Sequence, residues 1–280
     1  MNQHVQTTVG DEDHGPGHGH GHGHYAEVNG LRMYYEVHGE DRGQPPLVLI
    51  HGAFSATGTS WGELIGPLSR TRRVISVEQQ GHGRTADIDR PLRVARMAQD
   101  TADLLDRLGV DRADVYGYSM GVGVALRMGL DRPEKVRKLV LQSGSITMTG
   151  MHPGYEEMMQ QVQPEMLHGS PFHEEYVRIA PHPENFDRLV DKVKDMTAHV
   201  QDVTPAEMAD LTGPVLTIIG DSDIVRPEHA VEIFRLTGGG VNGDLAGLPE
   251  SQLAVLPGTT HIGSVQQDIL RAIVPAFLDK

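Results

Sequence analysis

Residues 113–122 read Ala-Asp-Val-Tyr-Gly-Tyr-Ser-Met-Gly-Val, and this stretch decides the fold. The apolar run that ends at Tyr116 predicts a buried strand, and the apolar residues after Met120 predict a helix. Between them, Gly117-Tyr118-Ser119-Met120-Gly121 matches the pattern G-x-S-x-G, in which small glycines permit a strained turn that exposes a serine hydroxyl. A strand that turns into a helix through this pentapeptide predicts a nucleophilic serine, Ser119.

The same pattern occurs a second time, at residues 58–62. No apolar strand leads into this copy, because residues 53–58 are mostly small or polar. We interpret Ser60 as the N-cap of a helix that carries Trp61, Leu64 and Ile65. The context therefore favours Ser119 over Ser60 as the nucleophile.

Two later strands run into residues that could complete the chemistry of a nucleophilic serine. Residues 216–219 lead into Gly220-Asp221-Ser222-Asp223, and residues 255–258 lead into Thr259-Thr260-His261. Catalytic groups of such sheets lie just past the carboxyl ends of the strands, and the chain order Ser, Asp, His suits this topology. We expect His261 to act as general base and an aspartate of the first loop to orient it, with the other aspartate shaping its turn.

Working outward, the remaining apolar runs predict a mostly parallel sheet. Strands are expected at residues 47–50, 73–77, 138–142, 214–219 and 252–256, after a hairpin that turns at Asn29-Gly30. Period-3.6 spacing predicts helices between them, including one from Glu228 to Leu236 and a last one with Val265, Ile269, Ile273 and Phe277 on one face. Alternating strands and helices imply an α/β fold with helices on both sides of the sheet.

Composition divides the chain into three parts. Residues 1–24 end in a Gly-His repeat and are expected to form a flexible tail, with loose binding of Zn, Ni or Cu as a less favoured function. Residues 25–145 and 212–280 are expected to form the core. Residues 146–211 contain six prolines and no buried-strand run, so we expect an inserted helical lid, in which seven methionines fill the core or contact ligands.

Charge and composition limit the classes of partner and location. The formal net charge of -14 argues against nucleic acid and anionic membrane surfaces as partners. No apolar stretch approaches the length of a membrane span, and the first 25 residues hold no signal-peptide core. We therefore expect a cytoplasmic protein. The absence of cysteine excludes disulfides, zinc-thiolate sites and cysteine nucleophiles.

Taken together in chain order, five motifs resemble the α/β-hydrolase superfamily. They are His51-Gly52, Gln80-Gly-His-Gly-Arg84, the G-Y-S-M-G pentapeptide, the G-D-S-D loop and P-G-T-T-H. The resemblance spans residue 25 to the C-terminus. It implies an eight-stranded, mostly parallel sheet with a helical cap and no cofactor or metal. It also implies that Asp223, the fourth residue of G-x-x-D, is the triad acid.

The same resemblance implies an oxyanion hole formed by main-chain N–H groups. One is that of Met120, and the other belongs to Ala53 or its neighbour Phe54, after His51-Gly52. We therefore expect a serine hydrolase that cleaves a small carboxylic ester or lactone through an acyl-enzyme. Cleavage of a C–C bond, peracid formation of the cofactor-free haloperoxidase kind and non-catalytic ligand binding remain alternatives. The serine at position 119 argues against the superfamily chemistries that use an aspartate nucleophile.

Overall fold

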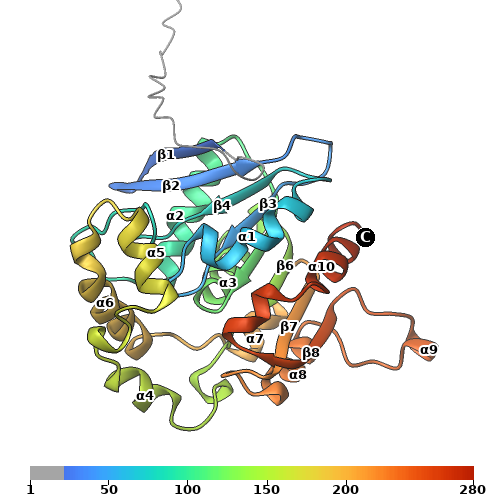
Figure 1. Ribbon diagram of the computed structural model, residues 1–280. Helices are drawn as coiled ribbons and strands as arrows, with labels where there is room; N and C mark the ends of the chain where they lie inside the picture. The colour runs from blue at the N-terminus through green and yellow to red at the C-terminus, as the bar shows by residue number, and fades with distance from the viewer. Residues whose placement is uncertain (1–21) are drawn as a thin grey trace, which may run out of the picture.

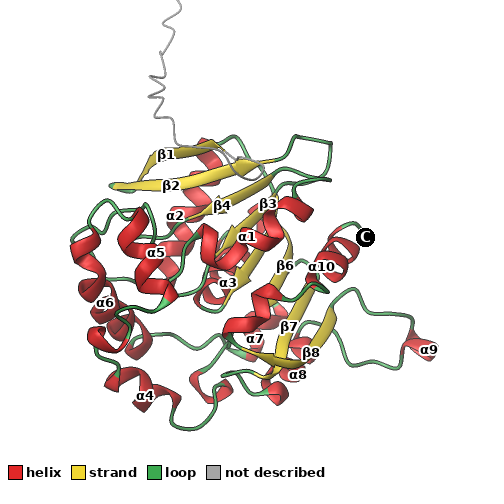
Figure 2. Cartoon of the chain, viewed as in Figure 1, coloured by secondary structure: helices red, strands yellow, loops and turns green. Residues whose placement is uncertain are grey.

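A computed structural model describes residues 22–280, which form an eight-stranded sheet covered by helices (Figures 1 and 2). The strand order is β1-β2-β4-β3-β5-β6-β7-β8. Only the β1–β2 and β2–β4 pairs are antiparallel, and the other five pairs are parallel. The predicted fold class, an eight-stranded and mostly parallel α/β sheet, is confirmed.

The elements follow one another in the alternating order that the sequence predicts. The strands are β1 (His22–Val28), β2 (Leu31–His38), β3 (Leu47–Ile50), β4 (Val74–Val77), β5 (Ala113–Tyr118), β6 (Val136–Gln142), β7 (Val215–Ser222) and β8 (Gln252–Thr260). The helices outside the segment between β6 and β7 are α1 (Thr57–Leu68), α2 (Val94–Arg107), α3 (Met120–Asp131), α8 (Pro227–Leu236), α9 (Gly243–Ala246) and α10 (Leu270–Leu278), with short 3-10 turns η1 (Pro133–Lys135) and η5 (Ile262–Gln266). Of these, α9 lies on a loop that projects away from the sheet (Figure 1).

The central strands are buried on both faces, which explains their continuous apolar sequence. In β3, Val48 and Ile50 pack into the cluster that contains α2 and α3, whereas Leu47 and Leu49 pack into the cluster that contains α1 and α10. Each residue of β3 therefore meets a helix layer, as the period-two geometry of a strand requires. Strands β3 to β8 run parallel to one another, so their carboxyl ends lie at one edge of the sheet.

A helical segment lies between β6 and β7. It holds α4 (Tyr155–Gln161), α5 (Pro171–Ile179), α6 (Phe186–Ala198) and α7 (Pro205–Ala209), with 3-10 turns η2 (Met148–Gly150), η3 (Pro164–Met166) and η4 (Pro183–Asn185). Figure 1 shows α4, α5 and α6 together on one side of the sheet. Among the seven methionines expected here, Met159, Met196 and Met208 are buried, whereas Met158 and Met166 are exposed. These side chains thus divide between packing and surface.

Two sequence interpretations about helices are wrong. Ser60 is not an N-cap, because α1 already begins at Thr57 and Ser60 lies buried inside it. The last helix is also not continuous: η5 ends at Gln266 and α10 restarts at Leu270. This interruption shifts the buried face to Leu270, Val274, Phe277 and Leu278, and leaves Ile269 52% exposed.

The first strand begins earlier than expected. The expected tail boundary at residue 24 is wrong, because residues 22–24 already belong to β1. They pair with Val37, Glu36 and Tyr35 of β2. A hydrogen-bonded partner strand fixes a backbone that glycine alone leaves free. Residues 1–21, with most of the Gly-His repeat, lie outside the described part of the chain. Within residues 22–280, no helix has the length and apolar character needed to cross a bilayer.

Candidate active site

Ser119 occupies a strained turn between β5 and α3. Its φ and ψ are 54° and -118°, values that residues with a side chain rarely adopt. Both flanking glycines are required sterically: a Cβ at Gly117 would lie 2.1 Å from the Gly121 carbonyl oxygen, and one at Gly121 would lie 2.1 Å from that of Ile50. The Ser119 N–H donates to the Gln142 carbonyl at 2.9 Å, which holds the turn against β6.

These contacts predict that replacing the last glycine by alanine changes the free energy of unfolding very differently in the two G-x-S-x-G copies. Gly121→Ala should lower the free energy of unfolding by about 3 kcal/mol, because a Cβ cannot fit against rigid backbone. Gly62→Ala in α1 is the matched control, since nothing lies within 4 Å of its Cβ position. That change should stabilise the protein by about 0.5–1 kcal/mol through helix propensity. Urea unfolding measures both, and equal effects would contradict the close packing of the turn.

The structure brings Ser119, His261 and Asp223 together at the carboxyl edge of the sheet. His261 Nε2 lies 3.0 Å from Ser119 Oγ, and His261 Nδ1 lies 2.8 Å from Asp223 Oδ1. Since an ionised carboxylate only accepts hydrogen bonds, Nδ1 carries the ring hydrogen and donates a hydrogen bond to Asp223. In the neutral imidazole Nε2 is then free to accept from the Ser119 hydroxyl. This arrangement suits removal of the serine proton.

The Asp223 carboxylate is buried and accepts several hydrogen bonds. Its Oδ1 also accepts the Val225 N–H at 3.2 Å, and its Oδ2 accepts the Ser143 hydroxyl at 2.6 Å. Burial raises the pKa of Asp223, but the bond and charge of His261, together with the Ser143 and Val225 bonds, outweigh it and leave the pKa below its usual value. The carboxylate is therefore charged at neutral pH.

Asp221 lies in the same loop but contacts different groups. Its carboxylate accepts the N–H groups of Gly258 at 2.8 Å and Thr259 at 3.1 Å, in the segment that leads to His261. These two bonds are the main reasons that the pKa of Asp221 is lowered. The exposed Asp221 thus joins the acid loop to the histidine loop, whereas Asp223 contacts the imidazole.

One predicted oxyanion donor, Met120, follows Ser119 in the chain, and the other, Ala53 or Phe54, belongs to the loop after β3. Met120 is the first residue of α3, so no preceding helical turn supplies a carbonyl for its N–H. The loop after β3 passes close by, since a Cβ at Gly52 would lie 3.2 Å from Ser119 Cβ. In this loop Phe54 has a φ of 63°, and no backbone hydrogen bond in the described chain uses the N–H of Ala53 or Phe54.

His51 and His82 are buried and neutral, and they hold loops in place. Burial lowers the pKa of His51 to about 3 and that of His82 to about 4. His51 Nδ1 donates to the Gly52 carbonyl at 2.7 Å, while its Nε2 accepts the Gln79 N–H at 3.0 Å. His51 therefore fixes the loop that carries Ala53 and Phe54.

Two further side chains support the site, and sequence reasoning missed both. Glu78 follows β4 and accepts the N–H of Thr57, at the start of α1, at 3.2 Å and that of Arg84 at 2.5 Å. Its burial raises its pKa to about 7. Tyr118 donates its hydroxyl to the His261 carbonyl at 3.1 Å, and the two rings lie 5.4 Å apart. The signal available in the sequence for Glu78 was an acidic residue directly after an apolar strand.

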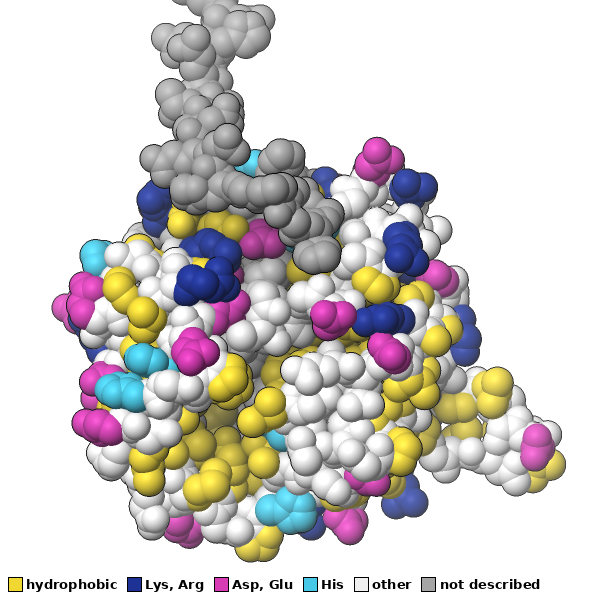
Figure 3. All heavy atoms as spheres, in the orientation of Figure 1, with side chains coloured by type: hydrophobic (Ala, Val, Ile, Leu, Met, Phe, Trp, Pro, Cys, Tyr) yellow, Lys and Arg dark blue, Asp and Glu magenta, His cyan; other side chains and the backbone are white. Residues whose placement is uncertain are grey.

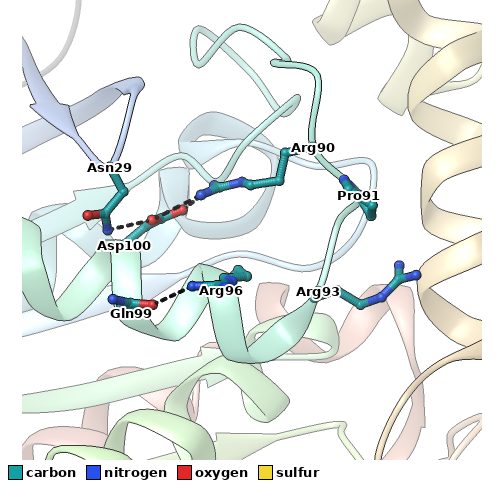
Figure 4. Close-up of a pocket in the computed structure, with 7 residues that line it drawn as sticks. All are labelled: Asn29, Arg90, Pro91, Arg93, Arg96, Gln99 and Asp100. Carbon is teal, nitrogen blue, oxygen red and sulfur yellow. Dashed lines mark hydrogen bonds and ion pairs between the residues drawn. The ribbon is translucent and has the colours of Figure 1, made fainter.

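A hollow of about 440 Å³ lies elsewhere, at the start of α2, and contains none of these residues. In Figure 4, Arg90 and Asn29 point at Asp100, Arg96 points at Gln99, and Arg93 points away from them. Arg93 pairs instead with Asp195 of α6 at 2.7 Å. The side chains of this hollow largely bind one another, and none of them contacts Ser119, His261 or Asp223.

Comparison with known proteins gives a family and several full-length structural neighbours. A family model described as alpha/beta hydrolase fold matches residues 45–202, more than half of the 280-residue chain. A relative from Caulobacter sp. (strain K31) with the provisional name carbamate hydrolase RutD is 34% identical over 118 residues, which is 42% of this chain and 43% of that protein. The chain thus spans less than half of that relative. A protein of the same name from Azorhizobium caulinodans is 25% identical over 276 residues, covering 90% of this chain and 97% of that protein.

Solved structures show the same fold at low sequence identity. The enol-lactonase from Burkholderia xenovorans LB400 has a TM-score of 0.68 and 19% identity, covering 91% of this chain and 100% of the other. The meta-cleavage product hydrolase CumD from Pseudomonas fluorescens IP01, as a mutant complexed with acetates, has a TM-score of 0.70 and 18% identity, covering 92% and 97%. Together with the family match and the architecture of the sheet, these likenesses give the identity of the fold, and the chain belongs to the alpha/beta hydrolase fold family.

Proposed function

We propose that the protein is a serine hydrolase that cleaves a small carboxylic ester or lactone through an acyl-enzyme. The observation that carries the proposal is the chain of contacts from Asp223 through His261 to Ser119, at 2.8 and 3.0 Å. A nucleophile, a base within hydrogen-bond reach and a group that orients the base are the parts that acyl transfer needs.

The proposed reaction has two halves. Ser119 Oγ attacks the carbonyl carbon while His261 Nε2 takes its proton, and the oxyanion is stabilised by the N–H of Met120 and by that of Ala53 or Phe54. His261 returns the proton to the leaving oxygen. Water then attacks the acyl-enzyme with His261 as base, which releases the acid and restores Ser119. The chemistry uses residues of this chain and water.

The histidine can serve both halves because its surroundings fix its position. Asp223 holds Nδ1, while the hydroxyls of Tyr118 and Ser264 donate to the His261 carbonyl at 3.1 and 2.8 Å. Loss of one oxyanion donor typically costs about 3 kcal/mol of transition-state stabilisation. The loop after β3 and the start of α3 are therefore proposed to contribute to the rate alongside the side chains.

C–C bond hydrolysis is the second candidate. It is favoured by the likeness to CumD, a meta-cleavage product hydrolase, just as the likeness to an enol-lactonase favours lactones. Each reaction uses an attacked carbonyl or an equivalent electrophilic carbon, so one set of groups could serve any of them. The choice depends on how the pocket holds the bond next to that carbon.

Residues 146–211 are proposed to act as a lid over this site. One side of the segment is tied to the core by Lys192 of α6, whose Nζ donates to Asp87 at 2.7 Å and to the Ile88 carbonyl at 2.9 Å. Within the segment, the Val203 N–H donates to the Ile146 carbonyl at 2.8 Å, which joins its last part to its first residue. Figure 3 shows hydrophobic side chains gathered in a hollowed area beside the cap helices, which favours an apolar acyl group.

A series of p-nitrophenyl esters from acetate to palmitate tests the proposal, extended to lactones and to a meta-cleavage dienoate. We expect ester or lactone turnover that depends on Ser119, with an optimum acyl length that measures the pocket. Turnover of the dienoate but of no ester or lactone would show that the protein is a C–C bond hydrolase and not an ester hydrolase. Hydrolysis that persists in Ser119→Ala would overturn the whole assignment.

A further inference from the structure

Ser143 lies directly behind the triad, at the carboxyl end of β6. It is buried, its N–H donates to the Ile218 carbonyl of β7 at 2.9 Å, and its φ is 56°. A serine in this left-handed conformation is uncommon, and the surrounding structure must hold it there. The turn sends its side chain toward Asp223.

The hydroxyl of Ser143 donates a hydrogen bond to one of the two oxygens of the Asp223 carboxylate. It donates to Asp223 Oδ2 at 2.6 Å, while the other oxygen, Oδ1, is occupied by His261 and by the Val225 N–H. Hydrogen bonds to a charged group are among the stronger ones in proteins. With both oxygens held, the carboxylate cannot rotate away from the imidazole.

A second buried hydroxyl, that of Ser264, lies between Ser143 and the main chain of the histidine. Ser143 Oγ lies 3.0 Å from Ser264 Oγ, and the Ser264 hydroxyl donates to the His261 carbonyl at 2.8 Å. Both serines are buried. Because each hydroxyl has one hydrogen, the Ser143 hydroxyl bonds Asp223 and the Ser264 hydroxyl bonds the His261 carbonyl, with the two oxygens in contact between the two loops.

We propose that Ser143 is a positioning residue of the triad, whose hydroxyl fixes the Asp223 carboxylate against His261. The inference rests on the proposed serine-hydrolase function and deepens it. Ser143 does not touch the substrate; it acts through Asp223. The Ser143 bond is also one of the contacts that keep the pKa of Asp223 low. The other titratable groups that face this carboxylate are the His261 imidazole and the Tyr118 phenol.

The test uses a fluorophosphonate probe, so that no substrate need be known. Ser119 Oγ forms a bond to phosphorus, the P–F bond breaks, fluoride leaves and the hydroxyl proton passes to His261. The second-order rate constant of labelling is measured against pH for the wild type and for Ser143→Ala and Ser143→Gly. Both variants lack the hydroxyl, but only glycine suits a φ of 56°.

We expect labelling of both Ser143 variants to slow about tenfold or more. Asp223, having lost a bond to its charged form, takes up a proton at higher pH, so the acid limb of the profile should move to higher pH. Ser251→Ala is the matched control, because its buried hydroxyl accepts the Val215 N–H at 3.1 Å at the opposite edge of the sheet. Its rate should stay within about twofold of the wild type.

Three results would overturn the proposal. They are wild-type rates in both variants, a wild-type rate in Ser143→Gly alone, which would assign the role to backbone strain, and a slower rate whose pH profile does not move. Ser119→Ala separates this failure from that of the proposed function. Labelling that persists in Ser119→Ala refutes the hydrolase assignment, whereas loss of labelling there with normal Ser143 variants refutes only the positioning role.

Discussion

Ser119→Ala is expected to lower kcat about a millionfold, to the residual rate that binding and oxyanion donors support. The reason is that Ser119 Oγ is the atom 3.0 Å from His261 Nε2, and no other hydroxyl of the described chain contacts that nitrogen. Turnover of the best ester from the acyl series measures the effect. A loss smaller than about a hundredfold would mean that another group attacks the substrate.

Stability provides an independent check on the same position. Ser119→Gly should be as inactive as Ser119→Ala. Its free energy of unfolding, measured with urea, should be about 1–2 kcal/mol higher, because only glycine tolerates a φ of 54° with a ψ of -118° without strain. The comparison asks whether the turn stores strain in order to expose the hydroxyl. Equal stability of the two variants would show that it does not.

Asp223→Ala is expected to lower kcat about ten-thousandfold, the scale found for the acid of a serine triad. Without the carboxylate, His261 loses the acceptor 2.8 Å from Nδ1, and with it the tautomer that leaves Nε2 free to take the serine proton. The loss should appear in kcat rather than in KM, because Asp223 is not placed to bind substrate.

Asp221→Ala is the matched control for this prediction. Asp221 stands two residues away and is also an acid, but it bonds the N–H groups of Gly258 and Thr259 rather than the imidazole. We expect a loss of less than about tenfold, from a looser loop before His261. A larger loss of kcat in Asp221→Ala than in Asp223→Ala would mean that Asp221, and not Asp223, orients His261.

The parts of the molecule that were predictable from sequence are those with strong local patterns. The buried strands stand out because a strand covered on both faces, such as β3, must be apolar at every position. The turn at Ser119 stands out because its glycines are required by contacts with backbone atoms. The proximity of Ser119, Asp223 and His261 follows from parallel strands that end at one edge.

What sequence reasoning missed depends on contacts between distant residues. The break before α10 has no glycine or proline to mark it, so period-3.6 spacing runs through it and selects the wrong face. The start of α1 at Thr57 is favoured by the Glu78 carboxylate, 21 residues away. Ser143 is an ordinary serine in sequence, and its bond to Asp223 spans 80 residues. No local pattern reveals such contacts.

The central claim is that the hydroxyl of Ser119, activated by His261, is the nucleophile. Peptide mapping of the fluorophosphonate adduct tests it most directly. We predict one adduct, on Ser119, which is absent from Ser119→Ala and from His261→Ala. An adduct on Ser60, the serine of the second G-x-S-x-G copy, or an adduct that forms equally well without His261, would contradict the account.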